Sequence, residues 1–316
     1  MEEKLNNMLN ITPGAIFSQP WWLDAVAPGS WDEVKVEKGG KLVARQPFVY
    51  RETRFGRSLC MPKLTQTLGP WIDVGDGHLT KQLSKYKALG SELIQKLPNF
   101  VNFSQSFHYS IDNWLPWYWA DFKQTTRYTY VIESLTDHEA LWNGLASGIK
   151  TDIRKAKKTV RVHMDDKLDA FMMLNKKVFE RQKIKQPYSR GVVDRVHAAC
   201  ASQNQNRIFV ARDESGRAHA GVYLVWDNDT AYYLMGGGDP DFRSSGATSY
   251  CLWEAIKFAS LVTKKFDFEG SMIEPVERFV RGFGGRPLPY MVISKMSPHW
   301  RVLSCTNKFV KKVIGK

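Results

Sequence analysis

The chain has 316 residues, a formal net charge of +13 and a 43% share of hydrophobic residues. This length is too great for one ordinary small domain and suits two domains of about 150 residues, each able to bury a core. No segment approaches the roughly 20 apolar residues of a membrane span, and the first residues lack the pattern of a secretory signal, so the sequence predicts a cytoplasmic protein and excludes an integral membrane protein.

The cysteines give no sign of a metal site or of a disulfide framework. Cys60, Cys200, Cys251 and Cys305 are scattered along the chain, and none forms a CxxC pair. Such spacing is typical of buried thiols rather than of zinc ligands or disulfides. We therefore expect no metal.

The positive charge is concentrated in one segment. Residues 150–190 contain 13 Lys and Arg against five Asp and Glu, a net charge of +8, which is over half of the excess. A local excess of this size favours a polyanionic partner.

The first half of the chain alternates helical and strand patterns. A short helix is expected over 21–26, strands over 33–37 and 41–51 with Gly39 and Gly40 as a hairpin turn, a helix over 79–96 and a strand over 100–104. The segment 62–71, rich in Pro, Gly and Thr, is either a structural crossover or a substrate-binding loop.

An aromatic cluster occupies residues 114–119, with the sequence WLPWYW. Rings of this kind can stack on a sugar or a base, or they can pack at a domain boundary. Packing is the favoured interpretation, because large aromatic side chains are mostly buried.

The second half predicts a helix, a basic helix, a strand and two helices, followed by a run of strands. A new domain is expected near residue 126, with Thr136 and Glu139 as a capping box for its first helix. The later elements are expected at 207–212, 218–227 and 230–235 (strands), 247–261 (helix), 266–269 and 290–295 (strands), with a tail helix within 297–316.

The segment 265–295 carries the strongest signal for a functional site. Phe266 and Phe268 alternate with Asp267 and Glu269, so a strand would place two aromatic rings on one face and two carboxylates on the other. Gly270 ends this strand. Ser271 can cap a short helix over 276–281, which the glycines at 284 and 285 end.

Two motifs resemble one family of proteins. FDFEGS, followed by RFVRGFGG and a tyrosine, resembles the signature of the FemABX peptidyltransferases and related FemAB-like proteins, and IRKAKKTVRV at 153–162 resembles a second block of that family. The resemblance implies an α/β (α+β) fold of two tandem GNAT-like domains with mixed, mainly antiparallel sheets. The order of strands and helices in the second half agrees with it. We expect one domain over 1–125 and another over 126–296, with the helix 297–316 packing back on the first.

The loop before the helix at 247 is a candidate phosphate site. In GNAT proteins the corresponding position holds an RxxGxG or RxxGxA motif, whose glycine and helix N-terminus approach a pyrophosphate. The matching residues here are Arg243, Ser244, Ser245, Gly246 and Ala247. An ordinary helix-capping loop is the alternative.

The carboxylate strand is the candidate catalytic site. Acyl transfer to an amine needs a neutral amine, and a nearby carboxylate can take its proton. Glu269 is the preferred base, Asp267 is the alternative base, and Tyr233 and Tyr290 are candidates for protonating a leaving group. The competing interpretations are an ion pair of Glu269 with Arg278 or Arg281, and half-buried strand positions for both tyrosines.

The basic block is the third candidate site. Spacings of three and four predict one cationic helix face, which either contacts phosphates or is simply solvated. Its members are Lys150, Arg154, Lys157, Lys158 and Arg161. The FemABX pattern has a lysine that assists transfer where this chain has Val280; Arg278 or Arg281 would have to replace it.

These features together predict a cytoplasmic N-acyltransferase or aminoacyltransferase. The resemblance implies aminoacyl-tRNA as the donor, whereas the GNAT-like fold implies acyl-CoA. The expected acceptor is an amine on a small molecule or a cell-envelope precursor, with peripheral contact at the membrane surface as a further option. A non-catalytic protein that binds RNA or a nucleotide-sugar is the alternative.

Overall fold

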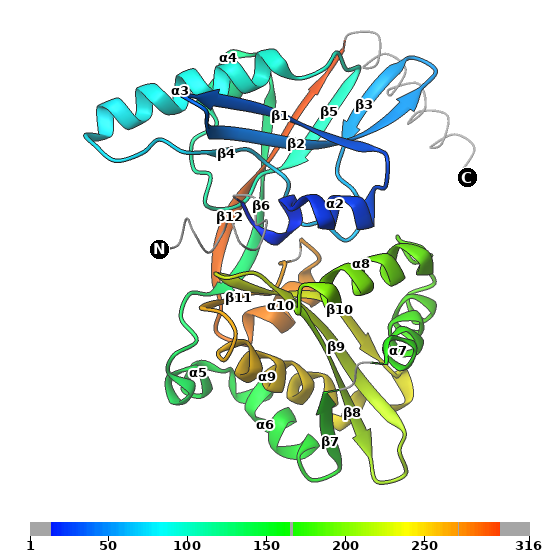
Figure 1. Ribbon diagram of the computed structural model, residues 1–316. Helices are drawn as coiled ribbons and strands as arrows, with labels where there is room; N and C mark the ends of the chain where they lie inside the picture. Colours follow the sequence, from blue (N-terminus) through cyan, green and yellow to red (C-terminus); the bar gives the residue numbers. More distant parts are fainter. Residues whose placement is uncertain (1–13, 165–166, 271, 298–316) are drawn as a thin grey trace. The chain divides into compact units, whose positions relative to one another are not determined.

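The computed structural model describes residues 14–164, 167–270 and 272–297 (Figure 1). The chain divides into two compact units. Unit 1 contains the described residues up to Arg127 and from Tyr290 onward, and unit 2 is Tyr128–Pro289. The strand predicted over 290–295 thus groups with unit 1, whereas the sequence analysis assigned it to the second domain. The predicted tail helix lies outside the described residues, except for Ser297.

Unit 1 is built on a mixed sheet with the strand order β1-β2-β3-β5-β12, and β4 pairs with β2. The strands are β1 (Trp31–Lys38), β2 (Lys41–Thr53), β3 (Gly56–Cys60), β4 (Trp71–Ile72), β5 (Asn102–Ser106) and β12 (Arg286–Met296). Only the β3–β5 pair is parallel among these pairs. Gly39 and Gly40 both have positive φ and form the predicted turn between β1 and β2.

In the described part of unit 1, four helices accompany this sheet. They are η1 (Ile16–Ser18), α2 (Pro20–Val26), α3 (Leu79–Lys96) and α4 (Leu115–Trp119). Leu89 and Leu93 of α3 join the buried core of the unit. A Cβ on Gly90 would lie 2.9 Å from Pro116 Cγ, so glycine allows α3 and α4 to pack closely.

Some side chains of the aromatic cluster are buried and others are exposed. Trp117 is fully buried and packs edge-on against Phe107, as the packing interpretation predicts. Tyr118 and Trp119 are exposed, so that interpretation is wrong for them. The short helix α4, which the sequence analysis did not predict, places these side chains on opposite faces.

Unit 2 contains the part of the mixed sheet that is ordered β6-β11-β10-β9-β8-β7. The strands are β6 (Lys123–Ile132), β7 (Val160–Met164), β8 (Asn206–Asp213), β9 (Ala218–Trp226), β10 (Thr230–Gly238) and β11 (Lys265–Asp267). All pairs are antiparallel except β10 with β11. The predicted meander of β8, β9 and β10 is confirmed.

Helices cover both faces of this sheet. They are α5 (His138–Gly144), α6 (Ser147–Ala156), α7 (Leu168–Arg181), α8 (Arg190–Ser202), η2 (Pro240–Ser245), α9 (Ala247–Ala259) and α10 (Glu274–Arg281). Along β9, Val222 and Leu224 pack in the same core cluster as Leu252 of α9. The alternate residue Tyr223 contacts Phe171 of α7. Because neighbouring side chains of a strand point to opposite faces, α7 and α9 lie on opposite sides of the sheet.

Two helix starts differ in detail from the sequence analysis. The cap of α5 is Asp137, whose Oδ1 accepts a hydrogen bond from Ala140 N at 2.9 Å, so the predicted box of Thr136 and Glu139 is wrong. Helix α10 begins at Glu274 with Pro275 in its first turn. Its predicted cap, Ser271, lies outside the described residues.

Within the described part of the chain, no helix is long and apolar enough to cross a membrane. The same residues contain no group of three or more His, Cys, Asp and Glu side chains that could hold a metal ion. Cys60, Cys200 and Cys251 are free thiols, of which the last two are buried.

Candidate active site at the divergence of β10 and β11

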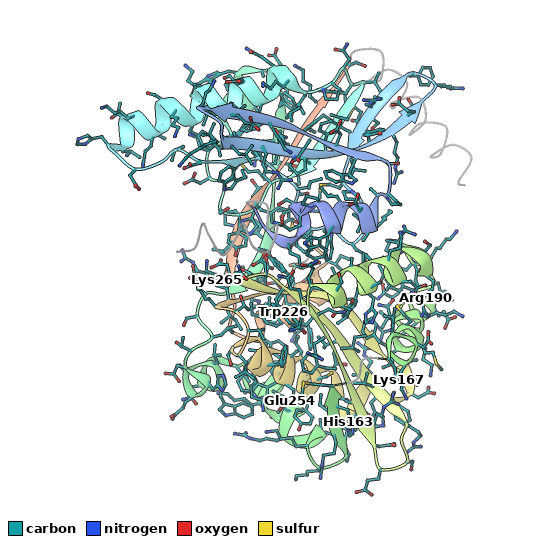
Figure 2. The ribbon with its side chains drawn as sticks, in the orientation of Figure 1. His163, Lys167, Arg190, Trp226, Glu254 and Lys265 are labelled. Carbon is teal, nitrogen blue, oxygen red and sulfur yellow. The ribbon has the colours of Figure 1, made fainter. Side chains whose placement is uncertain are left out.

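The site lies where two parallel strands part. Strands β10 and β11 pair over three residues only, from Thr230 with Lys265 to Tyr232 with Asp267. β11 then ends, whereas β10 continues to Gly238 with an irregular register after Tyr233. Figure 2 labels Lys265 at the start of β11. Asp267 is therefore the last paired residue of β11, and Glu269 and Tyr233 follow the point where the pairing stops.

Asp267 is enclosed, with only 1% of its surface exposed. Its Oδ1 accepts hydrogen bonds from the Thr129 hydroxyl and from Glu269 N, the latter at 2.7 Å. Its Oδ2 is buried with no hydrogen-bond partner in the described structure. Burial raises the pKa of Asp267 to about 7, although the two hydrogen bonds lower it in part.

Glu269 lies in the turn that follows the strand. Its φ of 56° is left-handed, a conformation that costs a non-glycine residue on the order of 1 kcal/mol or more. Its Oε1 is buried without a partner among the described residues. Burial, and then the negative charge of Asp267, raise the pKa of Glu269 well above its usual value.

Gly270 completes this turn. It also has a left-handed φ of 55°, and a Cβ there would lie 2.2 Å from the carbonyl oxygen of Tyr128. Only glycine fits so close to the backbone of β6. The turn therefore returns the chain against β6 and holds Glu269 beside Asp267.

The predicted alternative for Glu269, a structural ion pair, is wrong for the described residues. Arg281 Nε lies 3.0 Å from Glu277 Oε1, and Glu277 also accepts a hydrogen bond from the Tyr130 hydroxyl. Arg278 is exposed and forms no ion pair with a described residue. Neither arginine neutralises Glu269, so the site contains two carboxyl groups and no paired cation.

The two tyrosines differ in their relation to the carboxyl pair. Tyr233 is partly buried against the core of unit 2, and burial raises the pKa of its hydroxyl. This hydroxyl lies close over Gly236, where a Cβ would be 2.1 Å away. Tyr290 is buried but belongs to unit 1, so the site within unit 2 does not include it.

A polar network that the sequence analysis missed holds the second half of β10. Asn175 of α7 is buried, and its Nδ2 donates to Gly236 O at 2.7 Å. Its Oδ1 accepts from Gln186 Nε2 at 2.9 Å and from the Tyr188 hydroxyl at 3.0 Å. A lone Asn in an amphipathic helix gives no sign of this role, because the role depends on the packing of α7 on the sheet.

The candidate phosphate loop consists of the end of η2, Gly246 and the first residue of α9. Gly246 has φ 76°, and a Cβ there would lie 2.4 Å from the carbonyl oxygen of Asp152 in α6. Ser245 Oγ accepts a hydrogen bond from Ala247 N at 3.2 Å. The Arg243 side chain is exposed and has no hydrogen bond or ion pair with a described residue. A cation thus stands beside a helix N-terminus, the arrangement that holds phosphates.

Several contacts brace this loop. Asp239 accepts a hydrogen bond from Asp241 N at 3.1 Å and forms an ion pair with Lys177 of α7. The His219 ring stacks on Phe242 at 3.9 Å between centroids. On the α6 side, Lys155 Nζ donates to Ser244 O at 2.5 Å. The loop therefore has a fixed shape, and Ser244 contributes a carbonyl oxygen to it.

The basic block does not form a single helix face. Helix α6 ends at Ala156, Lys158 follows in a turn, and Arg161 lies on β7, so the predicted helical stripe is wrong for Lys158 and Arg161. The cations contact carbonyl oxygens and aromatic rings instead of carboxylates in the described structure: Lys150 with Asn143 O, Arg154 and Lys157 with Trp142, Lys157 also with Tyr250, and Arg161 with Lys157 O. Lys158 is also exposed. Their charge is therefore not neutralised by neighbouring acids.

The later part of the basic segment is different. Lys176 pairs with Glu180, and Arg190, labelled in Figure 2, pairs with Asp169 and Asp194. These cations have acidic partners within 4 Å. Arg181, Lys183 and Lys185 are exposed and form no ion pair with a described residue, so the unbalanced positive charge of residues 150–190 lies both on α6 with the start of β7 and on the segment that follows α7.

Comparison with known proteins identifies the fold of this site. Residues 145–271, which contain α6, the loop, α9 and the carboxyl pair, match the family described as acetyltransferase (GNAT) domain. The structure titled "Crystal structure of FemX" is 12% identical, covers 92% of this chain and 95% of its own, and has a TM-score of 0.69. The chain has a tandem GNAT fold.

Two further structures share this tandem GNAT fold. L-PGS from Bacillus licheniformis is 11% identical, covers 100% of this chain and 98% of its own, and has a TM-score of 0.56. A tandem GNAT protein from the clavulanic acid biosynthesis pathway is 9% identical over 93% of this chain and 94% of its own, with a TM-score of 0.51. No curated protein sequence matches the chain. The predicted fold class and resemblance are confirmed.

The FemABX pattern has a lysine at the position of Val280, and the structure of unit 2 explains why an apolar residue is found there. Val280 on α10 is buried in the core cluster with Phe283. A lysine at this position would have to bury its charge in an apolar environment, which is costly. The assisting lysine of the family pattern therefore has no equivalent at Val280.

Proposed function

We propose that the protein is an N-acyltransferase or aminoacyltransferase that uses the carboxyl pair of Asp267 and Glu269. The observation that supports this most is the pair itself: two buried carboxyl groups, each with an unpartnered oxygen, at the divergence of β10 and β11 in a GNAT domain. Carboxyl groups with raised pKa values are suited to accept a proton near neutral pH.

In the proposed reaction an amine attacks the acyl carbon of the donor directly. The bond from nitrogen to carbon forms, and the bond from carbon to the donor oxygen or sulfur breaks. Glu269, the less enclosed carboxyl group, accepts the proton of the amine. Before the reaction, Asp267 and Glu269 already hold one proton between them. This proton passes to the leaving oxygen or sulfur. Asp267 is the positioning residue, since it is enclosed and bonds to Glu269 N.

The favoured donor is aminoacyl-tRNA, which the FemABX resemblance implies. Its support is the cationic surface of α6, whose side chains lack acidic partners among the described residues and which contacts the loop through Lys155 and Ser244. Exposed arginines and lysines of this kind bind phosphates. Acyl-CoA remains the second donor, since Arg243 and the N-terminus of α9 suit its pyrophosphate equally. The acceptor is an amine on a small molecule or cell-envelope precursor.

A donor assay tests this function. The purified protein is incubated with labelled aminoacyl-tRNA or labelled acetyl-CoA and a set of amine acceptors, and labelled amide is measured. Glu269→Gln keeps the volume of the side chain but removes the proton acceptor, so turnover should fall by roughly a hundredfold or more. Its melting temperature should be kept or rise, because Glu269 has no cation to lose.

Glu277→Gln is the matched control. Glu277 is another carboxylate of unit 2, bonded to Tyr130 and Arg281 and outside the pair. Its replacement should leave turnover within a few fold. If neither donor gives amide above the rate of Glu269→Gln, while the protein still binds tRNA, then the non-catalytic RNA-binding alternative is correct.

A further inference from the structure

An aromatic ring reaches the surface of unit 2 where α5, α6 and α9 lie next to one another (Figure 1). Trp142 of α5 is only partly buried, and it packs edge-on against Trp253 of α9, with 5.4 Å between the ring centroids. Trp253 is buried in the core of the unit. The core therefore fixes the position of the Trp142 ring, while part of this ring stays open to ligands.

Three cations and a second ring lie beside Trp142. Arg154 Cζ is 5.6 Å and Lys157 Nζ is 5.9 Å from the centroid of its ring. Lys157 Nζ is also 5.7 Å from the ring centroid of Tyr250, a partly buried residue of α9. Arg161 joins the group, since its Nη1 donates to Lys157 O at 2.8 Å. We call these five residues the aromatic–cationic cluster.

The positive charge of the aromatic–cationic cluster remains when the neighbouring acids are counted. Its three cations are exposed and form no ion pair with a described residue. Residues 137–161 contain six Lys and Arg against three Asp and Glu, a net charge of +3. On α9, Glu254 is already paired with Lys257 at 2.7 Å. The cluster therefore favours an anionic ligand.

The aromatic–cationic cluster lies one helical turn from the candidate phosphate loop. Tyr250 N donates to Gly246 O at 3.1 Å within the first turn of α9. On α6, Arg154 is followed by Lys155, which contacts the carbonyl oxygen of Ser244 in the loop. A ligand with one phosphate at the loop can therefore place the adjoining nucleotide on the cluster.

We propose that the aromatic–cationic cluster binds a nucleotide whose base is unpaired. The base stacks on Trp142, and the phosphates contact Arg154, Lys157 and Arg161, because aromatic rings accept the faces of bases and cations accept phosphates. Cation–π contacts are weak at exposed sites, so the long side chains can turn from the rings to the phosphates. In a duplex the faces of the bases are covered by their neighbours, and an acidic peptide would leave the rings unused.

The unpaired 3′ end of a tRNA and the adenosine of CoA both offer this chemistry. The inference rests on the proposed function only in taking the ligand to be the donor. Binding is measured without turnover, so the two can fail separately: binding that depends on Trp142, with no amide formed, would keep this inference and overturn the transferase.

Binding of three probes to the full chain tests the proposal: a short single-stranded RNA, the same RNA paired with its complement, and CoA. Trp142→Leu should weaken binding of the unpaired probes about 5- to 100-fold, the effect of losing one base stack. The salt dependence of RNA binding should stay unchanged in this variant, because no phosphate contact is lost. Lys157→Ala with Arg161→Ala should instead reduce the slope by about 1.4.

Trp142→Phe should restore most of the affinity, since phenylalanine still offers a ring face. Tyr250→Leu gives a second measurement of stacking if Trp142→Leu does not fold. Trp119→Leu is the matched control, because Trp119 is a 53% exposed tryptophan of unit 1 with Lys87 Nζ 4.6 Å above its ring, and it should bind like the wild type.

The probes also distinguish the two sources of the nucleotide. Weaker binding of RNA alone in Trp142→Leu assigns the aromatic–cationic cluster to the tRNA end, and weaker binding of CoA alone assigns it to the adenosine of CoA; either result supports the proposal. Wild-type affinity in both ring variants overturns it. So does the absence of binding to both unpaired probes, or duplex and poly-glutamate binding as tight as that of the single strand, which would show a site for any polyanion.

Discussion

Burial makes ionisation of the Asp267 carboxyl group unfavourable in the folded protein. It is enclosed, and burial raises its pKa to about 7, whereas a carboxyl group in an unfolded chain has a pKa near 3.9. Between these values the folded state holds a proton that the unfolded state has released. The free energy of unfolding should therefore fall as the pH rises from about 4 to about 7.

Asp267→Asn should remove the part of this dependence that Asp267 contributes, because an amide does not titrate; Glu269, whose pKa is also raised by burial, should keep its own part. The pKa difference corresponds to about 4 kcal/mol, so the decline of the unfolding free energy across that pH range should shrink by up to that amount. Urea unfolding at a series of pH values measures it. Asp229→Asn is the control with the opposite sign, since the Lys265 ammonium holds the pKa of Asp229 below its usual value despite burial. A pH dependence unchanged in Asp267→Asn would show that Asp267 is ionised throughout.

The residue types of the site could be predicted from sequence, but their contacts could not. The alternation of Phe266 and Phe268 with the acids predicted a carboxyl pair, because one strand face had to be apolar. The bond from Thr129 to Asp267 depends on the register of β6 against β11, which pairs Val131 with Asp267 and is set by packing. The left-handed φ of Glu269 depends on how closely Gly270 approaches Tyr128.

Among the elements, long periodic segments were predicted best. The predicted bounds of α3 are confirmed, because its leucines recur at helical spacing. Strand β11 is shorter than predicted, since its neighbours pair with it only as far as Asp267. Arg161 was assigned to a helix, but Val160–Met164 pairs with β8, and this pairing is not local in sequence. Propensity alone cannot show that a distant strand will end a helix.

The loop before α9 gives a prediction at the scale of this element. Arg243→Ala should raise the dissociation constant of the donor by about 10- to 100-fold, the effect of losing a charge-assisted hydrogen bond. Donor titration by fluorescence or calorimetry measures it. The melting temperature should change little, because Arg243 has no partner among the described residues.

Lys257→Ala is the control for this change. Lys257 is a cation on the same helix, α9, but it pairs with Glu254, which Figure 2 labels. Its loss should leave donor affinity unchanged. If Arg243→Ala lowers the melting temperature while donor affinity stays constant, the segment is only a capping loop.

The charge of the whole molecule predicts how tRNA binding responds to salt. The chain carries +13, and part of the unbalanced charge lies on α6 and the start of β7. Contact with about five phosphates, at a slope near −0.7 for each, gives roughly hundredfold weaker binding between about 50 and 200 mM salt. Filter binding of tRNA at several salt concentrations measures this slope.

Two double variants test where these contacts lie. Arg154→Ala with Lys158→Ala should reduce the slope by about 1.4, because two phosphate contacts are lost. Lys176→Ala with Arg190→Ala should leave it nearly unchanged, since those cations already have acidic partners. Binding of tRNA that does not depend on salt would contradict an RNA donor and favour acyl-CoA.

The length of the chain predicted the number of units, but it did not predict which strands belong to each unit. A chain of 316 residues predicts two domains, and the chain divides into two compact units. The assignment of β12 could not be read from sequence, because its residues from Val292 to Met296 pair with β5, nearly 190 positions earlier in the chain. The exposure of Trp119 was also missed, since Trp117 and Trp119 are the same residue type and differ only in which side of α4 they occupy.

The hydrogen bond from Glu269 N to Asp267 Oδ1 has a spectroscopic consequence. A backbone amide proton that donates to a carboxylate responds in its chemical shift to the charge of that carboxylate. The Glu269 amide resonance should therefore follow the ionisation of Asp267 as the pH changes, independently of any turnover. The same resonance can be followed when a donor or an amine is added. It would report how each ligand changes the proton affinity of the pair before any bond is made or broken.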